Sequence, residues 1–140
     1  MIDAHEIARI IDANYNRSRE GLRVLEEILR FMKDDRELTK KLKDIRHGLT
    51  DAIMGFGLTR QELLDARDSE SDVGRHIEGE LESRRENLED IIASNFSRIE
   101  ESLRAIEEFG KLLDQSSARK IKDLRYEVYT LEKKFSIKQI

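Results

Sequence analysis

The sequence predicts an all-α protein, a four-helix bundle made of two duplicated antiparallel helical hairpins joined by a short helix and a polar loop. Three observations predict this class. The 140 residues include no proline, 6% aromatic and 40% charged residues, a composition typical of helices with wide solvated faces. Apolar residues recur three and four positions apart over four long segments, and one of these segments is repeated. A chain of this length buries one core, so we expect one helical domain over 1–140.

The first hairpin is predicted over about residues 3–56. Its first helix begins near Asp3, which forms a capping-box pattern with Glu6, and ends at about residue 32. Its second helix begins at residue 34 or 35 and ends at about residue 54, before two glycines. The short turn between them implies antiparallel packing. The apolar stripes consist of Ile7, Ile10, Ile11, Leu22, Leu25, Ile28 and Leu29, and of Leu38, Leu42, Ile45, Leu49 and Ile53.

A linker is predicted over about 57–79. Thr59 and Glu62 form a second capping-box pattern that opens a short helix, TRQELLDARD, and the polar stretch DSESDVGRHIEG follows. The second hairpin is predicted over about 80–135, with one helix at about 80–114 and another at about 117–134. The buried stripe of the last helix consists of Ile121, Leu124, Val128, Leu131 and Phe135.

The two hairpins are copies of one unit. ANYNRSREGLRVLEE at 13–27 matches SNFSRIEESLRAIEE at 94–108, and LKDIRHGL at 42–49 matches IKDLRYEV at 121–128. Two copies that each bury one stripe pack face to face, so we expect an approximate internal two-fold axis.

Polar residues interrupt the apolar arc of both copies. At about 100° per residue, Asn14, Arg17 and Glu20 form one row that points partly at the partner helices, and Asn95, Arg98 and Glu101 form its copy. A buried charge without a partner costs several kcal/mol. One interpretation is that Arg17 with Glu20 and Arg98 with Glu101 are structural ion pairs that fix the register of the bundle. The other is that both arginines, with Arg46 and Arg125 on the partner helices, form a pocket for an anion, with phosphate favoured.

The linker holds a second polar cluster. Arg67, Asp68, Glu70 and Asp72 lie within six residues and Gly74 follows. Such carboxylates could hold Mg²⁺ together with substrate phosphates, although charge runs in loops are more often solvated, and the loop could also fold over a pocket. Elsewhere, Tyr126 beside Arg125 could stack on a flat ring or be an ordinary half-buried tyrosine.

Several classes of function are excluded or disfavoured. The chain has no cysteine and only three scattered histidines, so we expect no disulfide and no haem, zinc or iron–sulfur cofactor. P-loop, Rossmann and nucleophile-elbow motifs are absent. A formal charge of -4 argues against a general binder of nucleic acid or of an anionic membrane. With no signal peptide and no long apolar run, we expect a cytoplasmic protein.

The chain resembles the alternative hydroxymethylpyrimidine phosphate kinases of thiamine biosynthesis, which occur alone or fused ahead of thiamine-phosphate synthase. The resemblance spans four blocks in order: RIIDANYNRSREGLRVLEEILRF at 9–31, LLDARDSESDVG at 63–74, ASNFSRIEESLRAIEEFGKL at 93–112 and IKDLRYEVYTLEKKF at 121–135. It implies transfer of the γ-phosphoryl group of ATP, with Mg²⁺, to hydroxymethylpyrimidine phosphate. Both substrates are polyanions, which agrees with the predicted anion pocket.

The resemblance also implies site residues. The blocks contain Asn14, Arg17, Glu20 and Arg23; Arg67, Asp68, Asp72 and Gly74; Asn95, Arg98, Glu101 and Arg104; and Arg125 and Tyr126. We expect Arg17, Arg98 and Arg125 to bind phosphate, Asn14 and Asn95 to read the pyrimidine edge, and Asp68 or Asp72 to serve the metal or the attacking oxygen. Glu20 and Glu101 could instead orient the arginines.

Two alternatives remain open at this point. The chain could be a non-catalytic helical module that binds a pyrimidine phosphate or docks on thiamine-phosphate synthase, or it could be a purely structural dimerisation bundle. The sequence shows no second domain, so we expect a free-standing form whose synthase is a separate chain. Whether copies of the chain assemble with one another stays open.

Overall fold

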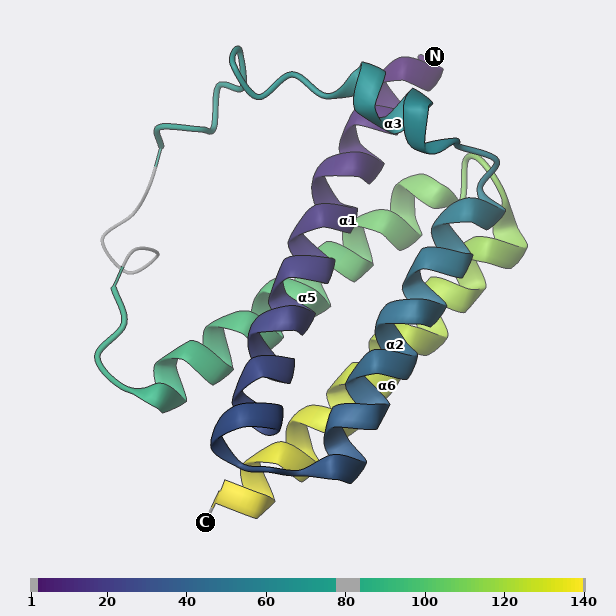
Figure 1. Ribbon diagram of the computed structural model, residues 1–140. Helices are drawn as coiled ribbons and strands as arrows, with labels where there is room; N and C mark the ends of the chain where they lie inside the picture. Colours follow the sequence, from purple (N-terminus) through teal and green to yellow (C-terminus); the bar gives the residue numbers. More distant parts are fainter. Residues whose placement is uncertain (1–2, 78–83, 140) are drawn as a thin grey trace.

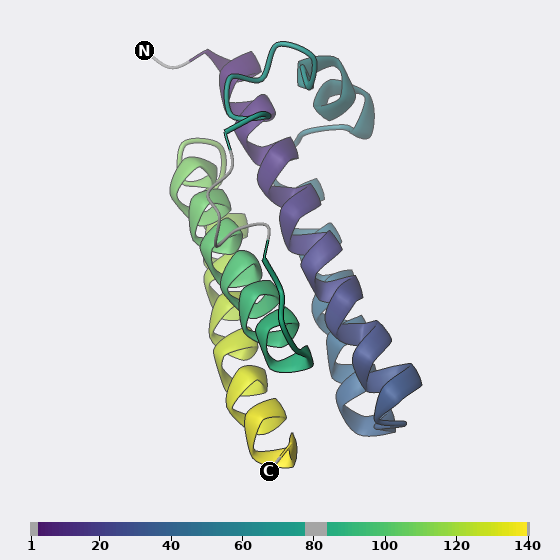
Figure 2. The same ribbon diagram turned by 90° about the vertical axis from the view of Figure 1, so that its left-hand side faces the viewer.

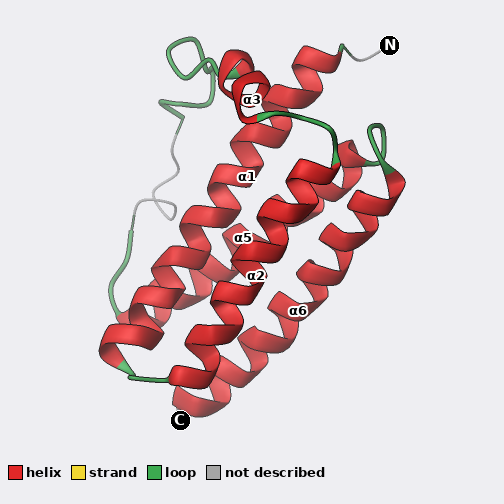
Figure 3. Cartoon of the chain, turned by 45° about the vertical axis from the view of Figure 1, so that its right-hand side comes forward, coloured by secondary structure: helices red, strands yellow, loops and turns green. Residues whose placement is uncertain are grey.

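The computed structural model describes residues 3–77 and 84–139, with side-chain environments described up to residue 135. Over these residues, helices are the only regular secondary structure. The helices are α1 (Ala4–Glu27), which continues into the π-helical turn η1 (Ile28–Met32), then α2 (Arg36–Gly55), α3 (Arg60–Ala66), α5 (Leu88–Gly110) and α6 (Gln115–Gln139). The predicted helical bundle is therefore confirmed (Figures 1 and 3).

The two hairpins form two layers. Figure 2 shows the hairpin of α1 and α2 beside the hairpin of α5 and α6. Between the layers, α1 packs mainly on α5, and α2 packs on α6. The short α3 lies against the first turns of α1 at one end of the bundle, and α6 ends at the opposite end (Figure 1).

The helix starts follow from local capping. Asp3 and Glu6 form the predicted capping box, and so do Thr59 and Glu62, which satisfies backbone N–H groups that have no partner within the helix. Asp35 accepts a hydrogen bond from the N–H of Leu38 and starts α2.

The second hairpin differs from the predicted boundaries. The third long helix was expected from about residue 80, but α5 begins at Leu88, because the side chain of Asn87 accepts from the N–H of Asp90 at 2.9 Å and 84–87 are not helical. Residues 80–83 of that expectation lie outside the described residues. At the other end, Asp114 accepts from the N–H of Ser117 at 2.8 Å, and α6 begins two residues earlier than expected.

The core follows the predicted stripes. Ile11, Leu25 and Leu49 of the first hairpin are fully buried, and so are Ile106 and Ile121 of the second. At the end of the core, the rings of Phe96 and Phe135 pack edge to face with centroids 5.6 Å apart. Burial of these apolar side chains is the main force that holds the hairpins together.

The helices α1 and α5 cross at a point of internal symmetry. The Ser18 and Ser102 hydroxyls are hydrogen-bonded at 2.6 Å, and a Cβ atom on Gly21 would lie 2.8 Å from Cγ1 of Ile99. In the sequence repeat, Ser18 corresponds to Ile99 and Gly21 corresponds to Ser102. Each contact is thus the symmetry mate of the other, which places the approximate two-fold axis at this crossing.

Candidate functional site

A cavity of about 1020 Å³ lies beside the crossing of α1 and α5, and the linker closes one side of it. We call it the arginine cavity. Asn14 and Arg17 come from α1, Asn95, Arg98 and Glu101 come from α5, and Gly74 and Arg75 come from the linker. The two polar rows of the repeat therefore meet in one cavity, with the exception of Glu20, which lines a separate cavity beside α3. Its remaining lining residues are Ile77, Arg85, Ala93, Ser94, Ser97 and Ser102.

The cavity is strongly basic. Among the described residues, its walls carry four arginines (Arg17, Arg75, Arg85 and Arg98) and one carboxylate, that of Glu101. An anion pocket of four arginines was expected, but two of the expected residues, Arg46 and Arg125, do not line this cavity. Arg75 and Arg85 line it instead. A concave surface that gathers arginines with so few carboxylates attracts an anion, and guanidinium groups match the geometry of phosphate oxygens.

Arg17 and Arg98, the arginines of the two rows, form no ion pair with a described carboxylate. Arg17 donates to Oδ1 of Asn14 at 3.4 Å, and neither Arg17 nor Arg98 lies within ion-pair distance of a described carboxylate. The interpretation that Arg17 with Glu20, and Arg98 with Glu101, are structural ion pairs is therefore wrong in this structure. Both guanidinium groups remain available to a ligand.

The two asparagines are fixed by their own helices. Nδ2 of Asn14 donates to the carbonyl of Ile10 at 2.9 Å, and Nδ2 of Asn95 donates to the carbonyl of Ile91 at 2.8 Å. The same bond is thus made in both copies. These bonds hold each amide rigidly at the cavity wall and use one of its two N–H groups.

Arg46 and Arg125 lie elsewhere, because each is paired with a buried glutamate. Nη2 of Arg46 lies 3.4 Å from Glu26, and Nη2 of Arg125 lies 3.0 Å from Glu107. Both carboxylates are nearly inaccessible, with 2% and 3% of the residue exposed, so each needs a cation beside it. The expectation that Arg46 and Arg125 join the anion pocket is corrected here.

The two glutamates were missed by sequence reasoning, although a signal existed. Glu26 and Glu107 are equivalent in the repeat. Each is preceded by a core leucine or isoleucine at the position before it and by a core leucine four positions before it, which places the glutamate on the buried side of its helix. The outer arginines of the repeat support the same carboxylates: Arg23 lies 3.9 Å from Glu26, and Arg104 lies 2.9 Å from Glu107. Arg23 and Arg104 are therefore part of two structural clusters.

The linker is anchored by a second pair that the sequence did not reveal. Nε and Nη2 of Arg67 donate to the two carboxylate oxygens of Asp12, both at 2.8 Å. Asp12 is buried in α1, and these hydrogen bonds raise the pKa of Arg67 above its usual value. Arg9 donates to the backbone carbonyl of Asp68 at 3.3 Å. The linker is thereby held on α1 at residues 67–68.

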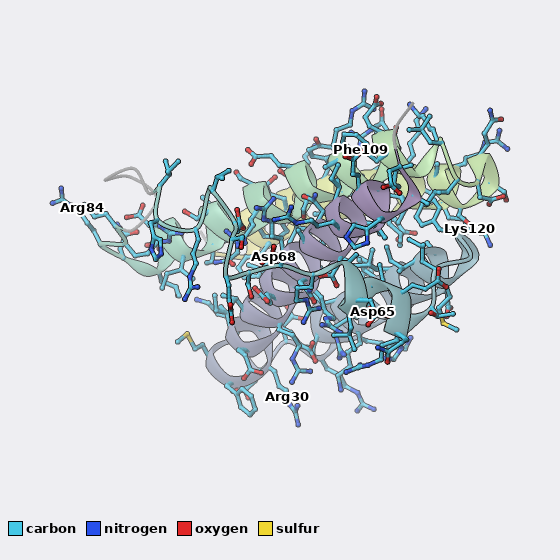
Figure 4. All side chains as sticks on the ribbon, turned by 90° about the horizontal axis from the view of Figure 1, so that it is seen from above. Arg30, Asp65, Asp68, Arg84, Phe109 and Lys120 are labelled. Atoms are coloured by element: carbon cyan, nitrogen blue, oxygen red, sulfur yellow. The ribbon has the colours of Figure 1, made fainter. Side chains whose placement is uncertain are left out.

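Asp68 and Asp72 shape the linker that follows. Oδ1 of Asp68 accepts from the N–H of Ser71 at 3.0 Å, and Oδ1 of Asp72 accepts from the N–H of Gly74 at 2.9 Å. In Figure 4, Asp68 lies over α1 and Arg84 lies at the far end of the molecule, where the chain returns to α5. The turn made by Asp72 places Gly74 and Arg75 at the cavity.

A second cavity, of about 530 Å³, adjoins the first and shares Ser97 and Glu101 with it. We call it the α5/α6 groove. Glu100, Arg104, Arg125 and Tyr129 complete its lining. Burial raises the pKa of Glu100 to about 8, and a hydrogen bond to the Glu132 carboxyl and the negative charges of Glu132 and Glu101 act in the same direction. Glu100 and Tyr129 were not predicted as site residues.

Tyr126 lies apart from both cavities that the arginines line. Its side chain is largely exposed and borders a cavity of about 590 Å³ between α2 and α6. The guanidinium carbon of Arg125 lies 5.2 Å from the centre of its ring. Tyr126 is therefore near Arg125, as expected, but it does not reach the arginine cavity.

Comparison with known proteins places the chain in a family. A family model described as the ThiD2 family matches residues 9–134, which include every described residue that lines the two cavities. The chain belongs to the ThiD2 family. The expected family resemblance is thus confirmed, and the duplicated rows of this ThiD2 chain lie within the matched region.

Related proteins carry the name thiamine-phosphate synthase. The chain is 42% identical to the thiamine-phosphate synthase of Synechocystis sp. over 90% of its own length and 35% of that protein. It is 38% identical to that of Rhodopirellula baltica, over 97% and 36%, and 40% identical to that of Thermosynechococcus vestitus, over 96% and 37%. The ThiD2 chain thus spans about a third of the length of these relatives. No solved structure matches it.

Two absences complete the description of the ThiD2 chain. No helix among the described residues has the length and apolar character needed to cross a bilayer. The described residues also contain no group of three or more His, Cys, Asp or Glu side chains arranged to hold a metal ion. Any Mg²⁺ at this site would depend on one or two carboxylates together with the oxygens of a substrate.

Proposed function

We propose that the chain transfers the γ-phosphoryl group of ATP to hydroxymethylpyrimidine phosphate and forms the pyrimidine diphosphate. Membership of the ThiD2 family and the names of its relatives support a role in thiamine biosynthesis. The observation that carries the proposal is the arginine cavity, in which Arg17 and Arg98 of the two repeats lie with Arg75 of the linker, and Glu101 is the one carboxylate that the described part of the chain adds to the lining.

The proposed reaction demands such a cavity. An oxygen of the substrate phosphate attacks the γ-phosphorus of ATP, the bond from that phosphorus to the bridging oxygen breaks, and ADP leaves. Phosphoryl transfer depends mostly on positioning and on neutralisation of charge. Arg17 and Arg98 come from the two copies of the repeat and both line the cavity; in this proposal each binds one phosphate.

Mg²⁺ fits this site in a limited way. Bound Mg²⁺ would neutralise charge on the phosphate oxygens. Asp68 and Asp72 do not line the cavity but precede its lining residue Gly74 in the linker, and each keeps one oxygen that makes no described hydrogen bond. They are the residues that would hold the ion together with the phosphates of the substrates.

The proposal is tested by incubation of the purified chain with ATP, Mg²⁺ and hydroxymethylpyrimidine phosphate, with products followed by ³¹P NMR. We expect the pyrimidine diphosphate and ADP in equal amounts. Arg17→Met and Arg98→Met should each lower kcat/KM by about a hundredfold or more, as the loss of a charge-stabilising group does. Arg119→Met, which removes an exposed arginine of α6 far from the cavity, should not.

A second function is favoured by one observation, the coverage of about a third of each synthase relative. A segment of that size could be a non-catalytic module that binds a pyrimidine phosphate for a thiamine-phosphate synthase. In that case the chain would bind hydroxymethylpyrimidine phosphate, form no diphosphate with ATP, and raise the activity of an added synthase. The same NMR assay, with and without synthase, separates the two functions.

A further inference from the structure

The α5/α6 groove opens into the arginine cavity, because Ser97 and Glu101 line both. We propose that this groove binds the flat ring of a substrate whose phosphate lies in the arginine cavity, and that Glu100 recognises a ring nitrogen with an amino group on the neighbouring carbon. The inference rests on the proposed function only for the identity of the phosphate-bearing ligand.

The groove has a flat wall suited to a ring. Tyr129 is 43% exposed, and the guanidinium carbon of Arg125 lies 6.0 Å from the centre of its ring. Tyr126 packs edge to face on Tyr129, with centroids 6.1 Å apart. Because Glu107 already offsets the charge of Arg125, this guanidinium offers a planar stacking surface more than a free charge. Planar heteroaromatic rings stack on tyrosine and arginine.

Glu100 supplies the polar recognition. Its Oε2 atom is buried and accepts no hydrogen bond from an N–H or hydroxyl group of the described residues, and the acid beside it is Glu132. At neutral pH the carboxyl retains its proton, because its pKa is raised to about 8. A protonated carboxyl presents a donor and an acceptor side by side. A ring nitrogen can accept a hydrogen bond from the O–H of the carboxyl, and a neighbouring amino group can donate one to its carbonyl oxygen. The carboxyl and the edge of the ring are therefore joined by two hydrogen bonds.

The charged neighbours of Glu100 are consistent with this role. After burial, the hydrogen bond to the Glu132 carboxyl of α6 does most to raise the pKa of Glu100, and the negative charges of Glu132 and of Glu101 on α5 add to it. Arg104 and Arg125 line the same groove, but both are paired with Glu107. On binding, the ring nitrogen would replace the Glu132 carboxylate as acceptor of the Glu100 proton.

The first repeat shows what happens when these positions change. Arg19 stands where Glu100 stands in the second copy, and Thr50 stands where Tyr129 stands. There the Tyr15 hydroxyl and the Thr50 hydroxyl are hydrogen-bonded at 3.0 Å, and Arg19 lies 4.9 Å from the centre of the Tyr15 ring. In the first hairpin, Arg19 and its neighbours Asn16 and Glu20 also line a cavity, of about 410 Å³, but α3 forms its other wall, and it has a guanidinium where the α5/α6 groove has the Glu100 carboxyl.

Two substrates of the proposed reaction carry the recognised edge. The pyrimidine of hydroxymethylpyrimidine phosphate and the adenine of ATP both have an amino group beside a ring nitrogen. Free hydroxymethylpyrimidine and adenosine, which lack phosphate, therefore serve as separate probes of the groove. Each is titrated by calorimetry against the native chain, Glu100→Leu, Glu100→Gln and the control Glu27→Leu, which changes an exposed glutamate of α1.

We expect Glu100→Leu to weaken binding of one probe at pH 7 by about tenfold or more, which corresponds to loss of at least 1.4 kcal/mol. Glu100→Gln should bind within about twofold of the native chain, because an amide also presents a donor beside an acceptor. At pH 9, one unit above the pKa of about 8, native binding should weaken by about tenfold and binding to Glu100→Gln should not change. Circular dichroism verifies that each variant is folded.

The outcomes separate this inference from the proposed function. If Glu100→Leu weakens the binding of hydroxymethylpyrimidine, the groove binds the phosphoryl acceptor. If it weakens the binding of adenosine, the groove binds the phosphoryl donor. If neither probe binds the native chain, or if folded Glu100→Leu binds both as the native chain does, the inference is wrong even where the diphosphate is formed. If binding depends on Glu100 but no diphosphate forms, the inference holds and the proposed kinase activity does not.

Discussion

At the level of single residues, buried charge decides which arginines can serve a ligand. Arg46 and Arg125 look equivalent to Arg17 and Arg98 in the sequence, since all four recur in the repeat. Only the first two lie beside a buried carboxylate, Glu26 or Glu107. A buried carboxylate requires a cation, so those arginines stabilise the fold and the other two remain at the cavity.

The two buried pairs should differ in what their loss costs. Without Arg125, Glu107 would keep Arg104 at 2.9 Å, whereas without Arg46, Glu26 would keep only Arg23 at 3.9 Å. We expect Arg46→Met to lower the free energy of unfolding by ~3 kcal/mol or more, the cost of a broken buried pair, and Arg125→Met to lower it by less. Urea unfolding measures both, with Arg119→Met as the surface control. Equal losses would contradict this ranking.

At the level of helices, the approach of α1 and α5 sets the geometry of the arginine cavity. The polar rows face each other only because Gly21 lets the two backbones come close, with Ile99 packed over the glycine. Ser18 and Ser102 close the same crossing from the symmetric position. A glycine within a helix weakens it by roughly 1 kcal/mol, so its presence here is explained by packing.

Gly21→Ala should therefore destabilise the protein despite its better helix propensity. The new Cβ would lie 2.8 Å from Cγ1 of Ile99, and such overpacking costs about 1–3 kcal/mol. Gly48→Ala is the matched control, because its Cβ would lie 3.1 Å from Cδ2 of Leu124, the mobile end of a half-buried side chain. We expect thermal unfolding to show a lower Tm for Gly21→Ala and a Tm near the native value for Gly48→Ala. The opposite order would exclude the close crossing.

At the level of the whole molecule, charge is distributed unevenly. The chain carries a net charge of -4, yet one cavity gathers four arginines from two hairpins and the linker. Like charges that line one cavity repel one another, and an anion bound among them would offset this repulsion.

An anion with two phosphate groups should consequently stabilise the folded chain. A ligand at a hundred times its Kd adds about 2.7 kcal/mol to the stability of a folded protein. We expect inorganic pyrophosphate to raise the Tm by several degrees at constant ionic strength, and chloride to have little effect. In Arg17→Met and Arg98→Met the rise should shrink, and in Arg119→Met it should persist. An equal rise in all four proteins would place the anion elsewhere.

Much of this architecture could be read from the pattern of residues. The long helices, both capping boxes, the duplication and the meeting of the rows that begin at Asn14 and Asn95 follow from spacing, because helical periodicity is local. The start of α5 at Leu88 was not predicted. The charged residues before Asn87 are compatible with a helix, and the hydrogen bond that makes Asn87 the N-cap is seen only in the structure.

The class of fold and the two polar rows follow from the order of residues alone, because periodicity, caps and internal repetition are properties of the sequence. Which arginines are neutralised depends on the packing of the folded chain. Asp12 binds Arg67 across 55 positions, and Arg75 reaches the arginine cavity from the linker. Such pairings depend on where distant helices and loops come together and on which carboxylates become buried there. The spacing of neighbouring residues determines neither of these.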